Sequence, residues 1–273
     1  MSGAHPESSG TGRRQRPGVV GTTAIRHYYR PSMKPTGAQS LRHSPLLLEG
    51  GNELRGAMEE ADRAALRAAG PGPVVIVPAA AAPEGGQHQA GANGVRWFKG
   101  LGASDVSSTG WVEGRSEDDA AIAQAVAASR LIFITGGSPR YLAEALQGSR
   151  VWAATRAAHA AGTVLAGSSA GAMVLCEAYY DPSAGRVMPG LGLLPRICIL
   201  PHYDTFGRGW TPHIERQVKG MLPVGIDEET GMLNDGPDGL WTVYGKGAVT
   251  LHGPGGEAVY RSGERFELPR QNA

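Results

Sequence analysis

The stretch Gly162-Thr-Val-Leu-Ala-Gly-Ser-Ser-Ala-Gly-Ala-Met-Val-Leu-Cys176 decides how the rest of the chain is interpreted. Its apolar run at 164–166 predicts a short buried strand, and the small and apolar residues after Gly171 predict a buried helix. Between them stands Gly-Ser-Ser-Ala-Gly, the G-x-S-x-G pattern of a nucleophile elbow, in which a tight strand-to-helix turn exposes the central side chain. Ser169 is that central residue and the predicted nucleophile.

A G-x-S-x-G match alone is weak in a chain with 41 glycines, because a Gly/Ser turn without chemistry has the same letters. The context favours catalysis, since a strand-like run precedes the pattern and a helix-like run follows it. At the start of such a helix, the free N–H groups and the helix dipole stabilise the negative charge that develops in acyl transfer.

Composition narrows the functional classes. The chain has 273 residues, with 26 Lys and Arg against 25 Asp and Glu, so its net charge of +1 gives no electrostatic case for nucleic acid or an anionic membrane. No apolar run approaches the roughly 20 residues that span a bilayer. Two cysteines, Cys176 and Cys198, fit a reducing compartment, and a cytoplasmic location is expected. No metal or cofactor is predicted, and the assembly stays open, with a homodimer as one option.

The amino-acid composition divides the chain into two parts. Residues 1–43 are rich in Gly, Ser, Pro and Arg and predict a disordered N-terminal arm, whereas residues 44–273 predict the folded domain. The pair Arg13-Arg14 is typical of a twin-arginine export signal. The segment that follows it is too short and too polar to be the apolar region of such a signal.

From residue 45, apolar runs alternate with helical stretches. Expected strands are 46–48, 74–77, 103–109, 131–134 and 164–166. Expected helices are 53–69 with Asn52 as its cap, one ending near Lys99 after a Gly/Ala loop at 79–94, 117–128 and 150–161. Short runs with glycine at their carboxyl ends predict a mostly parallel sheet with helices on both faces, a flavodoxin-like three-layer α/β sandwich.

The last third of the chain predicts an antiparallel extension at the sheet edge. A strand at 197–200 ends at Pro201-His202, a helix follows at 213–220, and a strand pair begins at Val224. The runs 240–244 and 248–251 around Gly245-Lys-Gly247 predict a hairpin.

A serine nucleophile needs a base, and the base needs an orienting acid. Of eight histidines, only His202 directly follows a buried strand, on the predicted rim that carries Ser169. Asp227 and Glu228 also reach this rim, and because neighbouring strand residues face opposite ways, only one of them can point at His202. Further candidate acids remain open: Asp181, Asp204 and Asp235.

The oxyanion that forms on the substrate needs two backbone donors. The segment Thr135-Gly136-Gly137, at the end of a strand, offers one N–H, and Ala170, just after the nucleophile, offers the other. The same glycines could simply turn the chain into a helix, which Pro139 at an early helical position supports.

The order of these residues separates two kinds of fold. The α/β-hydrolases run serine, acid, histidine, which here would require His252 with Asp235 or Asp238. The better-placed residues run serine, histidine, acid. Class I glutamine amidotransferases use a similar elbow with a cysteine nucleophile, but Cys176 lies seven residues after Ser169 and cannot replace it.

On these residues the chain resembles the aspartyl dipeptidase and cyanophycinase family of serine peptidases, whose fold is similar to the class I glutamine amidotransferase domain. The matching segments are Leu48-Glu-Gly-Gly51, Ile134-Thr-Gly-Gly137, Ala166-Gly-Ser-Ser-Ala-Gly-Ala172, Pro201-His-Tyr203 and Gly225-Ile-Asp-Glu-Glu-Thr230.

The resemblance implies a role for each candidate. Ser169 is the nucleophile, His202 the base and Glu228, rather than Asp227, the acid. The resemblance also implies backbone donors and substrate contacts, and these are Gly137 and Ala170 for the oxyanion and Gly136, Ser138 and Arg208 for the substrate. The chain departs from cyanophycinase-like members at Ser138-Pro139, where they carry an Asp-Gln pair whose glutamine helps hold substrate.

The sequence therefore predicts a serine hydrolase that cleaves a small peptide or isopeptide of aspartyl or β-aspartyl type through an acyl-enzyme. Two alternatives stay open: a non-catalytic peptide or small-molecule binding member of the same fold, and an amide- or ester-processing enzyme of a biosynthetic pathway.

Overall fold

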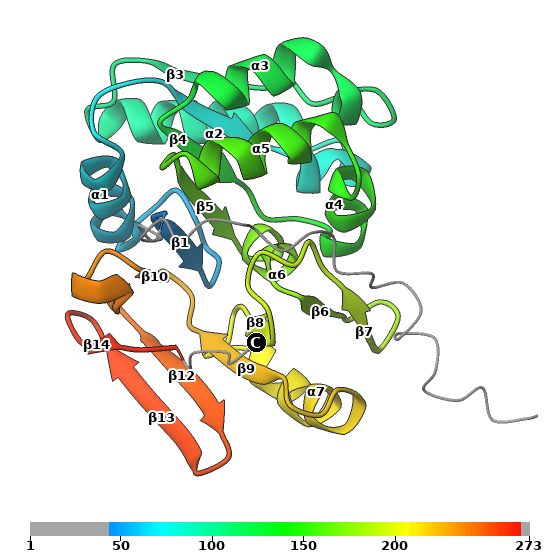
Figure 1. The fold of residues 1–273 in the computed structure, drawn as a ribbon, viewed down its shortest axis with the longest axis vertical. Coiled ribbons are helices and arrows are strands. Elements are labelled where there is room, and N and C mark those ends of the chain that lie inside the picture. Colours follow the sequence, from blue (N-terminus) through cyan, green and yellow to red (C-terminus); the bar gives the residue numbers. More distant parts are fainter. Residues whose placement is uncertain (1–43, 269–273) are drawn as a thin grey trace, which may run out of the picture. The chain divides into compact units, whose positions relative to one another are not determined.

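The apolar runs form the strands of an eight-stranded sheet in the computed structural model, which describes residues 44–268 (Figure 1). The strand order is β14-β11-β10-β1-β5-β4-β2-β3. The five strands β1, β5, β4, β2 and β3 are mutually parallel, and β10, β11 and β14 extend the β1 edge antiparallel. The bounds are β1 Leu46–Glu49, β2 Val74–Val77, β3 Val106–Ser108, β4 Leu131–Ile134, β5 Val164–Ser168, β10 Thr230–Leu233, β11 Trp241–Gly245 and β14 Arg265–Phe266.

Helices cover both faces of this sheet because successive side chains of each strand point to opposite faces. Leu47 packs with α1 and α2 on one face, whereas Leu46 and Leu48 belong to the core beneath the helices of the other face. The first face carries α1 Met58–Ala69 and α2 Gln87–Gly100; the second carries α3 Ala120–Ala128, α4 Pro139–Leu146, α5 Arg150–Ala160 and α6 Ala170–Leu175. The predicted flavodoxin-like three-layer fold is confirmed.

A second sheet was not expected. Its four strands lie in the order β13-β12-β9-β8, with β8 parallel to β9 and the other pairs antiparallel. The bounds are β8 Ile197–Leu200, β9 Leu222–Ile226, β12 Ala248–Gly253 and β13 Gly256–Arg261, and α7 Thr211–Gln217 lies between β8 and β9 in the chain. A short hairpin of β6 Ala178–Asp181 and β7 Arg186–Pro189 precedes them.

The predicted hairpin of residues 240–251 is wrong. β11 pairs with β10 and β14 in the large sheet, whereas β12 pairs with β9 and β13 in the small one. Gly245, with φ +100°, ends β11, and the chain then passes to the small sheet at β12. Glycine is required at 245 because a Cβ there would lie 2.2 Å from the carbonyl oxygen of Glu229. Two runs separated by a glycine turn resemble a hairpin in sequence even when each strand pairs elsewhere.

Two helix boundaries also differ from the prediction. Residues 53–57 are not helical; α1 begins at Met58, and Asn52 and Leu54 have positive φ angles of 55° and 62°. The expected Gly/Ala loop at 79–94 is mostly helical, with a 3-10 turn at Ala79–Glu84 and α2 beginning at Gln87. Glycine at positions 91 and 94 lets α2 lie close to the sheet, because a Cβ at Gly94 would be 2.9 Å from the Ile76 side chain.

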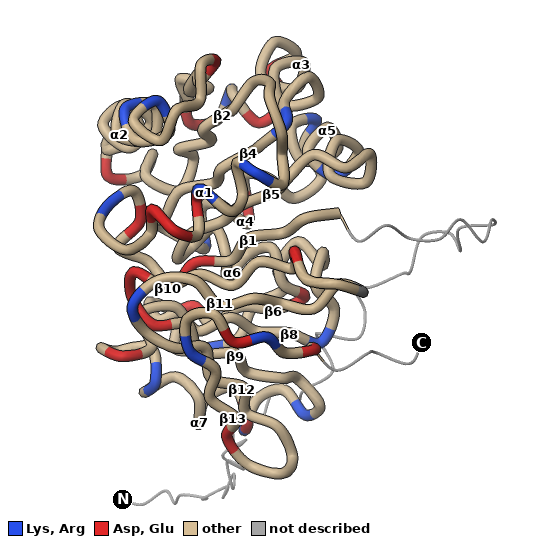
Figure 2. The backbone as a smooth tube through the Cα atoms, turned by 90° about the vertical axis from the view of Figure 1, so that its left-hand side faces the viewer, with Lys and Arg blue, Asp and Glu red and all other residues tan. Residues whose placement is uncertain are grey.

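The predicted N-terminal arm, residues 1–43, lies outside the described residues, as do residues 269–273. None of the helices between residues 44 and 268 is long and apolar enough to cross a membrane. Basic and acidic residues are interspersed along the described chain (Figure 2).

Candidate active site

Ser169 occupies a strained turn between β5 and α6. Its φ and ψ are 48° and −111°, a conformation that a non-glycine residue rarely adopts outside functional turns. The two flanking glycines allow this turn, because a Cβ on Gly167 would lie 2.7 Å from the Gly171 carbonyl carbon. The N–H of Ser169 donates to the carbonyl oxygen of Glu49 at 3.0 Å, which fixes the elbow to the end of β1.

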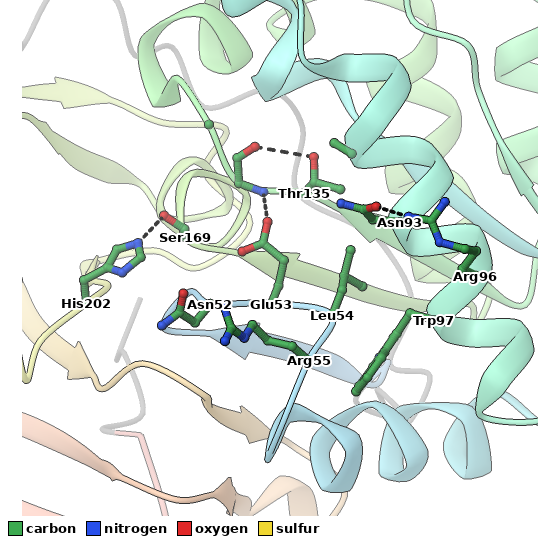
Figure 3. A pocket seen from close by; sticks show the side chains of 13 residues that line it. Asn52, Glu53, Leu54, Arg55, Asn93, Arg96, Trp97, Thr135, Ser169 and His202 are labelled. Carbon is green, nitrogen blue, oxygen red and sulfur yellow. Dashed lines mark hydrogen bonds between the residues drawn. The ribbon is translucent and has the colours of Figure 1, made fainter.

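The imidazole of His202 lies beside this serine. Ser169 Oγ and His202 Nε2 are 3.0 Å apart, within hydrogen-bond distance (Figure 3). The sequence predicts His202 on the rim of the large sheet. In the structure His202 follows β8 and therefore comes from the small sheet instead. Its N–H donates to the carbonyl oxygen of Gly50 at 2.7 Å, so a backbone bond joins the two sheets at the site.

The backbone of Gly51 packs directly against the imidazole. A Cβ at this position would lie 2.2 Å from Cε1 and 2.6 Å from Nε2 of His202, and the φ of Gly51 is +107°. Glycine is therefore required here both for the space and for the backbone conformation.

A carboxylate completes the chain of contacts. Glu228 Oε1 lies 2.8 Å from His202 Nδ1, and the two side chains are 21% and 19% exposed. Asp227 faces the other way and accepts the N–H of Ala248 at 2.8 Å. Burial is the main cause that raises the pKa of Asp227 above its usual value. The geometry thus brings Ser169, His202 and Glu228 into one line.

Two residues that the sequence did not single out as support hold Glu228. Asn52 Nδ2 donates to Glu228 Oε2 at 2.6 Å, and the N–H of Glu228 donates to Asp204 Oδ1 at 2.9 Å. Asn52 was expected to cap a helix and Asp204 was a rival acid. The sequence signal that could have found Asn52 is its place directly after Gly50-Gly51, in a segment whose helical pattern is weak before Met58.

A cavity of about 740 Å³ opens beside Ser169 and His202. Three elements supply most of its wall: the non-helical segment after β1, the inner side of α2, and the Thr135-Gly136-Gly137 turn after β4. The lining residues are Asn52, Glu53, Leu54, Arg55, Ala90, Asn93, Arg96, Trp97, Thr135, Gly136, Gly137, Ser169 and His202 (Figure 3).

Charged groups of both signs line this cavity. Glu53 accepts the N–H of Gly136 at 2.9 Å with one oxygen and the hydroxyl of Ser168 at 3.2 Å with the other. Arg55 and Arg96 supply the positive charge, and the guanidinium of Arg96 donates to Asn93. In the described chain, no group of three or more His, Cys, Asp or Glu residues is placed to hold a metal ion.

The two predicted oxyanion donors have free N–H groups within the described residues. Gly137 and Ala170 each lack a backbone or side-chain acceptor, whereas the N–H of Gly136 is taken by Glu53. Gly136 lies beside the nucleophile, since a Cβ there would be 3.2 Å from Cβ of Ser169. The turn also starts α4, so both interpretations of the glycine pair fit.

Ser138 and Arg208, the other predicted substrate contacts, do not line the cavity. Ser138 is the N-cap of α4, and its Oγ accepts the N–H of Tyr141 at 3.3 Å. The guanidinium carbon of Arg208 lies 5.0 Å from the centre of the Tyr203 ring. Their contact with substrate stays a prediction.

The remaining rivals lie elsewhere. Asp181 accepts the N–H of Ser183 at 2.9 Å in the β6–β7 turn, and Asp235 accepts the hydroxyl of Tyr244 at 2.6 Å. Nε2 of His252 is 2.6 Å from the hydroxyl of Tyr203, away from the serine. Burial raises the pKa of the Cys176 thiol well above its usual range.

Two fully buried carboxyls lie behind the cavity. Burial raises the pKa of Glu49 well above its usual value, and the charges of Asp62 and Glu53 raise it further. Burial also raises the pKa of Asp62 to about 7, against the effect of Trp97, whose Nε1 donates to Asp62 at 2.7 Å. Trp97 is a wall of the cavity, so this pair supports the site from beneath.

Comparison with known proteins identifies the family of the chain. The sequence profile of peptidase family S51 matches residues 47–233, the span from β1 to β10 that contains all three aligned side chains. The chain belongs to peptidase family S51. It is thus a serine-type peptidase, and the resemblance to the aspartyl dipeptidase and cyanophycinase family is confirmed.

Two solved structures share the fold of this S51 peptidase. A peptidase from an acI-B1 Actinobacterium superposes with a TM-score of 0.73 at 24% identity, covering 82% of this chain and 97% of the other. A protein assigned as a peptidase E from Listeria monocytogenes EGD-e superposes with a TM-score of 0.53 at 17% identity, covering 73% and 97%. Among curated protein sequences nothing matches the chain.

Proposed function

We propose that this S51 peptidase cleaves a small aspartyl or β-aspartyl peptide through an acyl-enzyme, with Ser169, His202 and Glu228 as the catalytic triad. The observation that carries the proposal is the continuous line of contacts from a strained serine, 3.0 Å from Oγ to Nε2 and 2.8 Å from Nδ1 to the carboxylate. A nucleophile, its base and an orienting acid in this geometry are the requirements for acyl transfer by serine.

Each group has one task in the reaction. Ser169 Oγ attacks the scissile carbonyl carbon while its proton passes to His202 Nε2, and Glu228 stabilises the imidazolium through Nδ1–H. The N–H groups of Gly137 and Ala170 stabilise the oxyanion. The tetrahedral intermediate collapses when the C–N bond breaks and Nε2 gives its proton to the leaving amine. Water then attacks the acyl carbon while Nε2 of His202 takes its proton, and the free acid leaves as the bond to Ser169 Oγ breaks and Nε2 returns the proton to that oxygen.

The charged residues of the cavity suit a substrate whose acyl residue carries a carboxylate and an amino group. Arg55 and Arg96 suit a side-chain or main-chain carboxylate, because a guanidinium binds a carboxylate through paired N–H donors. Glu53 suits a substrate ammonium, since its two oxygens each keep a lone pair after accepting one hydrogen bond. The backbone of Gly136 would border the scissile bond. Ser138 and Arg208 enter this proposal as contacts of the leaving half.

A panel of dipeptides tests the substrate class. Peptides with Asp, β-linked Asp, Asn, Ala or Lys as the acyl residue are incubated with the purified chain, and release of free amino acid is measured. The aspartyl and β-aspartyl peptides are expected to react fastest. Preference for an acyl Lys would contradict the assignment of Arg55 and Arg96.

Ser169→Ala tests the nucleophile. The variant is expected to lose at least about 10³-fold in kcat/KM, because without the hydroxyl no acyl-enzyme forms and the base has no proton to take from a nucleophile. A fluorophosphonate probe should label the wild type at this serine and leave the variant unlabelled. Wild-type turnover by the folded variant would remove the proposed mechanism. Absence of labelling in the folded wild type would favour the alternative that the protein binds peptides without cleaving them.

We further propose that residues 44–273 form the catalytic domain and that residues 1–43 lie outside it. The family match begins at residue 47, after this arm. Removal of residues 1–43 is expected to leave kcat/KM for the best dipeptide unchanged. Light scattering of the full chain decides between a monomer and the homodimer.

A further inference from the structure

An exposed aromatic ring borders the proposed base. Phe206 stacks on His202 with ring centres 4.8 Å apart and an angle of 22° between the planes. Its side chain is 53% exposed, although a large apolar ring is normally buried. Of the three large hydrophobic residues with this degree of exposure between residues 44 and 268, it is the aromatic one, the others being Val112 and Val259.

The turn that carries this ring is tightly held. The carbonyl oxygen of His202 accepts the N–H groups of Thr205, Phe206 and Gly207 at 3.1, 3.1 and 2.9 Å, and also the Thr205 hydroxyl at 3.0 Å. Glycine is required at 207, since a Cβ there would lie 2.0 Å from the carbonyl oxygen of Pro201. The ring is thus presented by fixed backbone next to the imidazole.

Further aromatic rings continue from Phe206. Trp210, half-buried, lies with its ring centre 5.4 Å from that of Phe206, and Tyr180 lies 5.4 Å beyond Trp210. The ring of Phe206 therefore contacts His202 and Trp210, while about half of the residue stays exposed to solvent.

The proposed mechanism indicates which half of the substrate lies next to the exposed ring of Phe206. The cavity residues labelled in Figure 3 extend from His202 past Ser169 toward Trp97 and Arg96, and Phe206 is not among the cavity's lining residues. If the acyl half lies toward Arg96, the leaving half lies at the opposite end of the cavity, beside His202. The leaving amine takes its proton from Nε2 of His202, so the leaving residue starts at the imidazole that Phe206 covers.

We propose that Phe206, backed by Trp210, is the subsite for the leaving residue and selects peptides in which that residue carries an aromatic or large aliphatic side chain. The proposal rests on the proposed function, because it uses the position of the leaving amine. Burial of a large apolar side chain against an exposed ring favours the transition state of such peptides over that of an alanyl peptide by about tenfold.

The test compares two leaving residues with one acyl residue. The acyl residue is the one that the wild type cleaves fastest, and the peptides end in Phe or Ala. We expect kcat/KM to favour the Phe peptide by about tenfold in the wild type and by less than about twofold in Phe206→Ala, while Phe206→Leu keeps part of the preference. Val259→Ala is the matched control, an exposed apolar residue on β13 outside the site, and should keep the full preference.

Two results would overturn the subsite. Equal kcat/KM for both peptides in the wild type removes it directly. An equal loss of kcat/KM for both peptides in Phe206→Ala shows that the ring only positions His202, because the loss of a positioning residue lowers kcat/KM for every substrate by the same factor.

The proposed function can fail separately. If the wild type cleaves neither peptide, their binding to Ser169→Ala is measured by calorimetry, with Ser169→Ala/Phe206→Ala for comparison. Tighter binding of the Phe peptide that the double variant loses supports the subsite without turnover. Equal binding of the two peptides refutes it.

Discussion

The two sheets contribute different halves of the site. The eight-stranded sheet supplies Ser169 and the proposed oxyanion donors, Gly137 and Ala170, at the carboxyl ends of its parallel strands, where ligands collect in open α/β sheets. The four-stranded sheet supplies His202 and Glu228 from the ends of its parallel pair, β8 and β9. The halves meet through backbone contacts of Gly50 and Gly51. In the proposed mechanism, catalysis therefore depends on how the small sheet is held against the large one.

Within the small sheet, the largest expected effect comes from the proposed acid. Glu228→Gln removes the negative charge that stabilises the imidazolium and should lower kcat/KM by about 10³-fold. Asp227→Asn is its matched neighbour: the amide oxygen can still accept the N–H of Ala248, so kcat/KM should change less than about twofold. Steady-state cleavage of the best dipeptide measures both. A larger loss in Asp227→Asn would reverse the assignment of the two acids.

The junction between the sheets predicts the next effect. A Cβ introduced by Gly51→Ala displaces the imidazole, and a misplacement of about 1 Å costs on the order of 10² in kcat/KM. Gly148→Ala is the control, because Gly148 also has a positive φ, 75°, but no atom within 4 Å of its Cβ position. It should cost some stability and leave kcat/KM unchanged. Thermal unfolding separates the two effects, and equal loss of activity in both variants would assign the effect to backbone strain alone.

The contrast between the sheets also explains what the sequence could predict. Parallel strands buried on both faces appear as uninterrupted apolar runs, such as Leu131–Ile134, and glycine follows them where the chain turns at the site. Ser169 and the Gly136-Gly137 turn could be placed on this basis. The small sheet could not, because β12 pairs with β9 and β13, and nothing local distinguishes that pairing from a hairpin with β11.

The segment after β1 was missed for a different reason. The sequence predicts a helix from residue 53, yet residues 53–57 are not helical, and Asn52 and Leu54 adopt positive φ angles. Tertiary contacts hold this conformation: Asn52 donates to Glu228, and Glu53 accepts from Gly136 and Ser168. Partners more than 80 residues away override local propensity here. Catalytic support residues are therefore hard to predict where a weak helix pattern meets a turn that the site requires.

Carboxyls on the two sides of the junction give the smallest expected effect on catalysis and a distinct effect on stability. Glu228 in the small sheet is partly exposed, whereas Asp62 on α1 is fully buried, and burial raises its pKa to about 7. In the unfolded chain this carboxyl titrates near pH 4. The folded state therefore binds the extra proton between about pH 4 and 7, and the free energy of unfolding should fall as pH rises through this window.

Asp62→Asn should make that fall smaller by on the order of 3 kcal/mol, because an amide has no charge to bury. The amide oxygen can still accept the indole N–H of Trp97, so the cavity wall stays in place and kcat/KM should change less than about threefold. Urea unfolding at pH 5 and pH 8 measures the difference, with Asp105→Asn as the exposed control. If the slope with pH is unchanged in Asp62→Asn, the buried pair carries its proton on Glu49 instead, and Glu49→Gln should then flatten the profile.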